Sequence, residues 1–194
     1  MASSSAVPLL LLDVDGVLNP YAMEQRVAGA FEDFEAHEAR GFQLRLSRAM
    51  GRGLLALSAE LCWATTWADT VDRDVAPYCG LPAGLRVVAR PPVEPAALVT
   101  NWKLVQVRQL VEAAKRPFVW VDDDAFDWPG PGGEDPRAWS ARCPLPHLLL
   151  SPDPTTGLTP GQLEEIGAFF AAQPPAPSPP GASRLAGGVG RLRP

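Results

Sequence analysis

The sequence is poor in several residue types, and each scarcity excludes a class of protein. Its three cysteines are widely spaced and form no CxxC pair, which argues against a disulfide framework or a zinc site and predicts a reducing, cytoplasmic location. No apolar stretch reaches the length of a membrane span, and the apolar run near the N-terminus ends in two aspartates. We therefore expect neither a membrane anchor nor a signal peptide.

Basic residues are scarce as well. Only Lys103 and Lys115 are lysines among the 17 Lys and Arg, against 22 Asp and Glu. Residues 174–194 hold six of the 22 prolines and three of the arginines, and we predict a disordered tail because they cannot bury enough apolar surface. Residues 1–173, predicted to be one domain, therefore carry eight more acidic than basic residues. Such acidity argues against a broad, stable nucleic-acid-binding face, but a pocket for one phosphate is compatible with it.

Short apolar runs alternate with helical patterns along the chain. This alternation predicts an α/β fold of the Rossmann-like kind, with a mostly parallel sheet of about five strands and helices on both faces. In such sheets, ligands bind beyond the carboxyl ends of the strands. We predict strands at residues 9–14, 61–64, 85–89, 118–121 and 147–150, and helices at 43–60, 69–79, 101–114 and 159–172.

Two aspartates end the first predicted strand. Asp13 and Asp15 are two residues apart, so both side chains can address one pocket, and Gly16 lets the chain turn sharply. Two carboxylates this close in a dry pocket repel one another, and Mg²⁺ is a cation that such a pair binds together with a phosphate oxygen. The pair also allows one acid to attack while the other moves a proton. The alternative is an ordinary turn that closes a strand.

Further polar residues follow the other strands. Asp122, Asp123 and Asp124 end the fourth strand, where they either surround something positive or form a solvated acidic turn. Thr65 ends the second strand and offers a hydroxyl for a phosphate oxygen. Lys103 lies in the first turn of its predicted helix, an unfavourable place for a cation unless an anion binds nearby.

Tryptophans flank these polar residues. We interpret them as core or pocket wall rather than as a platform on which nucleobases stack. They are Trp63, Trp67, Trp102 and Trp120.

The order of these motifs resembles the haloacid dehalogenase (HAD) superfamily over about residues 7–172. The resemblance rests on four motifs in series. The residues around the later motifs are most similar to those of small, capless bacterial HAD domains related to RNA-repair proteins. The motifs are Asp13-Val-Asp15-Gly16-Val, Thr65 after a strand, Lys103 opening a helix, and Asp122-Asp123 after a strand.

The resemblance implies a role for each motif. Asp13 is the nucleophile and Asp15 the general acid and base, and an aspartate at position 15 favours phosphatase over dehalogenase chemistry. Lys103 and either Thr65 or Thr66 hold the phosphoryl oxygens. The implied ligands of a Mg²⁺ cofactor are Asp13, the Asp15 backbone carbonyl and an acid of the pair Asp122 and Asp123, with Asp123 favoured.

The insert after the first strand is short. Residues 20–43 leave room for a flap but for no large cap, so we expect an open site. The expected substrate is a phosphate ester on a small molecule or on a polynucleotide end; the sequence gives neither its identity nor the oligomeric state. Two alternatives are a catalytically silent HAD-fold binding protein and a glycosyltransferase that uses the two aspartates to hold a metal and a nucleotide sugar.

Overall fold

The structure is a computed structural model that describes residues 7–21, 29–88 and 101–173. The predicted tail, residues 174–194, therefore lies outside the described residues. No helix in the described ranges is both long and apolar enough to cross a membrane. The strands are β1 Leu9–Leu12, β2 Phe34–Ala39, β3 Phe42–Ser47, β4 Glu60–Trp63, β5 Arg86–Val87, β6 Phe118–Val121 and β7 His147–Leu150. The helices are α1 Arg48–Ala56, η1 Ala68–Thr70, α2 Val71–Asp74, α3 Ala76–Cys79, α4 Trp102–Ala114, η3 Pro131–Gly133, α5 Pro136–Arg142 and α6 Pro160–Ala171.

The predicted parallel sheet is confirmed. Five strands pair in the order β5-β4-β1-β6-β7, and every pairing among them is parallel. The central strand β1 consists of four leucines that are fully buried, as a strand covered on both faces requires. All five strands lie within or beside the ranges that the apolar runs predict.

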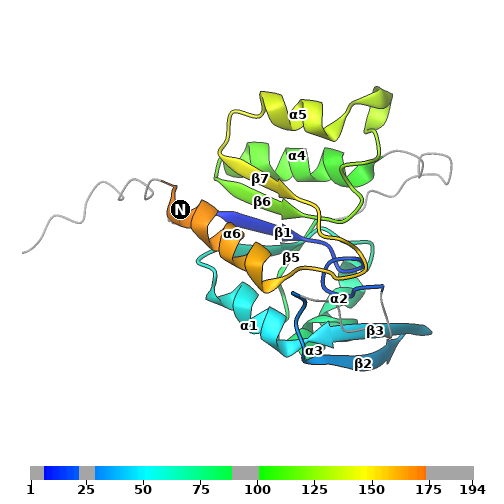
Figure 1. The fold of residues 1–194 in the computed structure, drawn as a ribbon. Helices are drawn as coiled ribbons and strands as arrows, with labels where there is room; N and C mark the ends of the chain where they lie inside the picture. The colour runs from blue at the N-terminus through cyan, green and yellow to red at the C-terminus, as the bar shows by residue number, and fades with distance from the viewer. Residues whose placement is uncertain (1–6, 22–28, 89–100, 174–194) are drawn as a thin grey trace, which may run out of the picture.

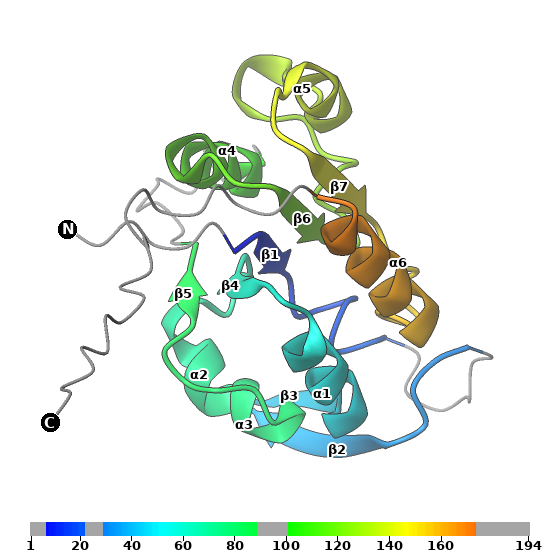
Figure 2. The same ribbon diagram turned by 90° about the vertical axis from the view of Figure 1, so that its left-hand side faces the viewer.

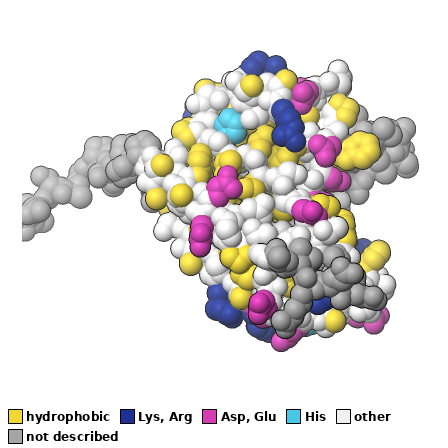
Figure 3. Space-filling model, in the orientation of Figure 1, with side chains coloured by type: hydrophobic (Ala, Val, Ile, Leu, Met, Phe, Trp, Pro, Cys, Tyr) yellow, Lys and Arg dark blue, Asp and Glu magenta, His cyan; other side chains and the backbone are white. Residues whose placement is uncertain are grey.

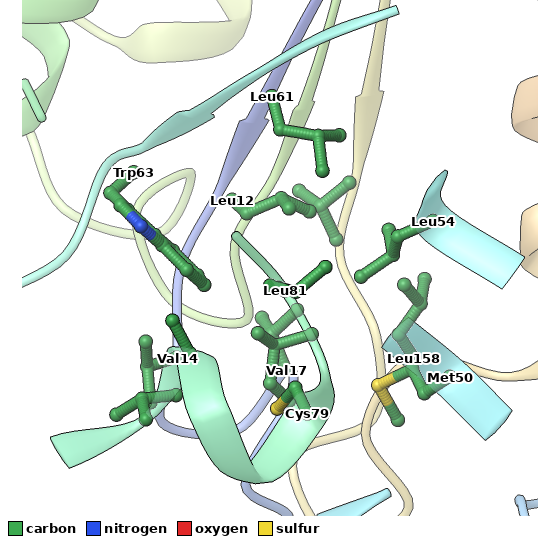
Figure 4. Close-up of a cluster of buried hydrophobic side chains, with 14 of the residues drawn as sticks. Leu12, Val14, Val17, Met50, Leu54, Leu61, Trp63, Cys79, Leu81 and Leu158 are labelled. Atoms are coloured by element: carbon green, nitrogen blue, oxygen red, sulfur yellow. The ribbon is translucent and has the colours of Figure 1, made fainter. Parts of the chain in front are cut away.

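Helices cover both faces of this sheet, with α4 and α5 on one side and α1 and α6 on the other (Figures 1 and 2). Because side chains alternate along a strand, Leu10 and Leu12 face α1 and α6, while Leu9 and Leu11 face α4 and α5. Figure 4 shows the first of these two cores, where Leu12 lies between Trp63 and Leu54 of α1. The two cores fix the sheet between rigid layers.

The predicted helix at residues 43–60 is wrong in its first part. Residues 42–47 form β3, which pairs antiparallel with β2, and the helix begins only at Arg48. Leu44 and Leu46 are both buried and lie two residues apart, so they share one face of a strand, and pairing with β2 supplies the backbone hydrogen bonds. The Ser47 side chain accepts a hydrogen bond from the Met50 amide and so caps α1.

Two further details differ from the prediction. Residues 69–79 form three short helical pieces, η1, α2 and α3, because the backbone departs from helical geometry at Val75 and Pro77 offers no amide hydrogen. The short helix α5 between β6 and β7 was not predicted at all. Neither difference changes the order of the sheet.

The loop after β7 packs against the loop after β1. Gly157 has a positive φ of 71°, and a Cβ there would lie 2.6 Å from the Val17 carbonyl oxygen. The next residue, Leu158, donates its amide to that same oxygen at 2.8 Å. This contact supports the chain that follows Asp13 and Asp15.

Candidate active site

The carboxyl ends of three neighbouring strands bring the predicted site together. Asp13 follows β1, Thr65 follows β4 and Asp122 follows β6, and both neighbours pair with β1 in parallel. The fourth contribution comes from α4, whose second residue is Lys103.

Asn101 fixes the start of α4 beside this edge. Its side-chain oxygen accepts from the Leu104 amide and so caps the helix. Its Nδ2 donates to the carbonyls of Ala125 and Trp128 at 2.5 and 3.2 Å, which ties the helix to the loop after β6. Lys103 is thereby held over the carboxylates.

Lys103 bridges two buried carboxylates. Its Nζ donates to Asp13 Oδ2 at 2.5 Å and to Asp122 Oδ2 at 2.8 Å, and all three side chains are at least nine-tenths buried. Burial lowers the pKa of Lys103, but Asp13 and Asp122 outweigh it, so that this pKa lies above its ordinary value. The lysine is therefore a fixed positive charge beside the candidate nucleophile.

Burial raises the pKa of Asp13 and Asp122 despite this lysine. For Asp122, burial and then the charge of Asp13 raise the pKa to about 8. For Asp13, burial also outweighs the lowering effect of Lys103 and of hydrogen bonds from Val14 and Thr65. One lysine thus compensates this group of acids only in part.

The acids after β6 differ in their partners. Asp122 Oδ2 is occupied by Lys103, and its Oδ1 accepts from the Ala125 amide at 2.9 Å. Asp123 is half-buried and lies against Gly16, where a Cβ would come within 2.2 Å of Asp123 Oδ2. Gly16 has a φ of 70°, so the turn after Asp15 both needs a glycine and leaves space for Asp123.

Four carboxylates could hold a metal ion. Oxygens of Asp13, Asp122, Asp123 and Asp124 lie within 4.8 Å of one another, and the Asp15 carboxylate is not part of this group. Burial, followed by the charges of Asp124 and Asp13, raises the pKa of Asp123 to about 6. An all-oxygen donor set in which ionisation is costly fits a hard divalent cation, because the ion would offset the repulsion.

Asp15 is held by two N–H donors. Asn19 Nδ2 donates to Oδ1 and Trp67 Nε1 donates to Oδ2, each at 2.9 Å. Asn19 is itself fixed, because its Oδ1 accepts from the Arg45 amide and its backbone closes the turn onto Gly16. The second aspartate of the pair therefore has a defined orientation.

The two threonines have different environments. Thr65 is fully buried, hydrogen-bonds to Asp13 and accepts from the Trp67 amide at 3.4 Å. Thr66 is exposed and lines the pocket in front of Asp13. Which of them holds a phosphoryl oxygen stays a prediction.

This pocket has a volume of about 390 Å³ and opens beside the acids. Aromatic side chains form part of its wall, among them Trp102. Trp63 and Trp120 lie in the core, and pocket wall and core are the two places predicted for these tryptophans. Burial and nearby acids, first Asp123, raise the pKa of Tyr21 in this wall to about 12. The pocket is lined by Asp13, Asp15, Tyr21, Thr66, Asn101, Trp102, Lys103, Asp123, Asp124, Ala125 and Trp128.

Several of these residues were not found from the sequence. Asn19 closes the conspicuous run that begins at Leu9, but nothing in the sequence links it to Asp15. Tyr21 and Trp128 follow a turn and a loop, and no periodic pattern places them at the site. Only the folded chain brings them to the carboxyl edge of the sheet.

A comparison with protein families gives an independent result. The family model described as the HAD domain in Swiss Army Knife RNA repair proteins matches residues 9–163. The matched range includes Asp13, Lys103 and the acids after β6. No curated protein and no solved structure matches the chain.

Proposed function

The chain belongs to the family of HAD domains in Swiss Army Knife RNA repair proteins, and from this membership we propose that it is a magnesium-dependent phosphohydrolase that works through an aspartyl-phosphate intermediate. The observation that carries the proposal is the buried contact of 2.5 Å between Lys103 Nζ and Asp13 Oδ2, beside a group of four carboxylates. Phosphoryl transfer needs mainly positioning and charge neutralisation, and both are present in this arrangement.

Asp13 and Asp15 divide the chemistry. A carboxylate oxygen of Asp13 attacks phosphorus in line; the new P–O bond forms as the bond to the leaving oxygen breaks, and Asp15 gives that oxygen a proton. A water molecule then attacks the aspartyl-phosphate, Asp15 takes the proton back, and phosphate leaves with Asp13 regenerated. Two hydrogen bonds, from Asn19 and Trp67, orient Asp15 for both steps.

The remaining residues handle charge. Lys103, with Thr65 or Thr66, binds the phosphoryl oxygens. Asp13, the Asp15 backbone carbonyl and Asp123 would hold Mg²⁺. Asp122 positions Lys103, because it is fully buried and does not line the pocket, whereas Asp13 and Asp123 do. When bound, Mg²⁺ supplies further neutralisation of the phosphoryl oxygens.

The insert after β1 supports an open site. Among the described residues of the insert, the β2–β3 hairpin is the only sheet element, and two short strands are too small to form a cap domain. An open pocket suits a bulky phosphate ester, and we propose a phosphorylated polynucleotide end in preference to a small molecule. On the face of the molecule that Figure 3 shows, basic side chains occur in separate groups, which supports a local rather than a broad contact.

Release of inorganic phosphate tests the proposal. Wild type is expected to hydrolyse glycerol 2-phosphate or p-nitrophenyl phosphate with Mg²⁺ and to lose this activity when the metal is removed. Asp13→Asn should abolish turnover, whereas the control Asp69→Asn, an exposed aspartate of η1, should keep it. Full activity of Asp13→Asn would show that Asp13 is not the nucleophile.

The same assay separates the alternatives. A silent binding protein would release no phosphate from any ester. A glycosyltransferase would bind a nucleotide sugar in calorimetry, but that interpretation leaves the bridge from Lys103 to Asp13 and Asp122 without a purpose.

A further inference from the structure

A second pocket, of about 460 Å³, continues from the first. Asp15, Tyr21 and Thr66 line both pockets, so the two meet at the candidate general acid. The rest of its wall comes from Asn19, Trp67 and the tip of the β2–β3 hairpin, residues 40–44. Nothing in the phosphoryl-transfer site uses this space.

The hairpin tip presents one aromatic ring and one cation. Phe42 is 64% exposed although it packs edge-on against Trp67, with ring centroids 6.4 Å apart. Arg40 also lies over the Trp67 ring, with its Cζ 6.0 Å from the ring centroid. Arg40 donates to Thr70 Oγ1 at 3.4 Å, and within the described part of the chain no ion pair holds its guanidinium.

The turn holds these two side chains in place. Ala39 pairs with Phe42, so only Arg40 and Gly41 connect the strands, and both have positive φ values, of 55° and 79°. Two-residue turns of this kind match the twist of the strands and fix their register. The turn therefore keeps the exposed Phe42 ring and the Arg40 side chain at the mouth of the second pocket.

The proposed reaction places its leaving group toward this second pocket. Asp15 must reach the leaving oxygen to protonate it. Asp13 and Lys103 line only the first of the two pockets that meet at Asp15. The group attached to the leaving oxygen therefore extends past Asp15 toward Trp67 and Phe42.

Resting on the proposed function, we propose that the second pocket binds the terminal nucleoside of a phosphorylated polynucleotide, with the base stacked on Phe42 and the next phosphate bound by Arg40. A nucleobase has the flat π-face that an exposed aromatic ring binds without regard to sequence. A single guanidinium suits one backbone phosphate. The net negative charge of the chain, with 22 Asp and Glu against 17 Lys and Arg, limits the contact to the end of the strand.

Hydrolysis of substrates with and without a base tests Phe42. We expect Phe42→Ala to lower kcat/KM for a 3′- or 5′-phosphorylated oligoribonucleotide about 10-fold more than kcat/KM for glycerol 2-phosphate, which has no ring to stack. Phe42→Trp should keep the oligonucleotide rate. The matched control is Leu55→Ala, an exposed apolar residue of α1. Equal losses on both substrates, or no loss on the oligonucleotide, would overturn the proposal.

Salt dependence tests Arg40. One phosphate contact to a single strand contributes about 0.7 to the slope of log KM against log salt concentration. Arg40→Gln should reduce the slope by up to that amount for a dinucleotide with one terminal phosphate, which condenses fewer counterions than a long strand, and leave the slope unchanged for a mononucleotide. Arg52→Gln, an exposed arginine of α1, is the control. An unchanged slope for the dinucleotide would contradict the assignment.

The outcomes separate this inference from the function on which it rests. If wild type hydrolyses no ester at all, the proposed function fails. If it hydrolyses glycerol 2-phosphate or a phosphoserine peptide faster than every phosphorylated oligonucleotide, the phosphohydrolase stands and the nucleoside pocket is refuted. Comparison of the 3′- and 5′-phosphorylated oligonucleotides identifies the end from which phosphate is removed.

Discussion

Replacing Lys103 by methionine is the most informative perturbation of this site. The lysine is the cation that joins Asp13 to Asp122, with N–O distances of 2.5 and 2.8 Å. Methionine keeps an unbranched side chain of similar length and removes the charge. Both carboxylates would then remain buried without a counter-charge.

The magnitude follows from the burial of all three groups. Removing one partner of a buried ion pair costs about 3–5 kcal/mol of the free energy of unfolding. For a domain of this size, 1 kcal/mol corresponds to about 2–4 °C in Tm, so we expect Tm to fall by about 6–20 °C. Activity should fall to background because the phosphoryl oxygens lose their cation.

The loss of stability should depend on pH in one direction. An aspartate in the unfolded chain ionises near pH 4, whereas the pKa of folded Asp122 is already about 8. Without Lys103, the carboxyl pKa values in the folded protein rise further, so the folded form binds more protons than the unfolded form between these pH values. The deficit relative to wild type should therefore grow from pH 5 to pH 8.5.

Thermal unfolding followed by circular dichroism measures this, in the absence of metal and at both pH values. The matched control is Lys115→Met, because Lys115 is the other lysine and is exposed at the C-cap of α4. Equal Tm values for the two variants at pH 8.5 would refute the assignment of Lys103 as the buried bridge. A deficit that shrinks as pH rises would refute the electrostatic account.

Four further substitutions test other parts of the site. Asp123→Asn should abolish Mg²⁺ binding in calorimetry, and Asp124→Asn should weaken it less because Asp124 is exposed. The Mg²⁺ affinity of wild type should rise as the pH passes about 6, where Asp123 ionises. Equal effects of the two variants would contradict the ligand assignment. Gly16→Ala places a Cβ 2.2 Å from Asp123 Oδ2, so Mg²⁺ affinity should fall about 10- to 100-fold. Wild-type affinity in this variant would show that the close approach has no function. Trp67→Phe keeps an aromatic ring but removes the donor to Asp15, and kcat for glycerol 2-phosphate should fall about 10-fold at constant KM. A change in KM alone would mean that Trp67 only shapes the pocket.

The sheet and its reactive edge were predictable because the signals are local. The leucines of β1 and the run from Phe118 to Val121 are apolar without interruption, as strands buried on both faces require. Parallel strands then force Asp13 and Asp122 to the same edge. The position of Lys103 in the first turn of its helix was predictable for the same reason, since Asn101 is a recognisable N-cap.

The β2–β3 hairpin was not predictable from local patterns. Leu44 and Leu46 alternate as strand residues do, but they run directly into α1, and the backbone hydrogen bonds of this strand come only from pairing with residues 34–39. The second pocket depends on that pairing, because Phe42 and Arg40 reach Asp15 only through the turn at the hairpin tip.

Sequence alone thus determined the α/β sheet, the order of its motifs and the residue types at its carboxyl edge, since each depends on neighbours along the chain. Tertiary structure decided which acids contact Lys103, which threonine faces the pocket, and what holds Asp15. Those assignments depend on distances of a few ångströms between residues far apart in the chain, such as Asp13 and Lys103 or Asp15 and Trp67. Such distances are set by the packing of the helices and the hairpin on the sheet, and no single segment encodes them.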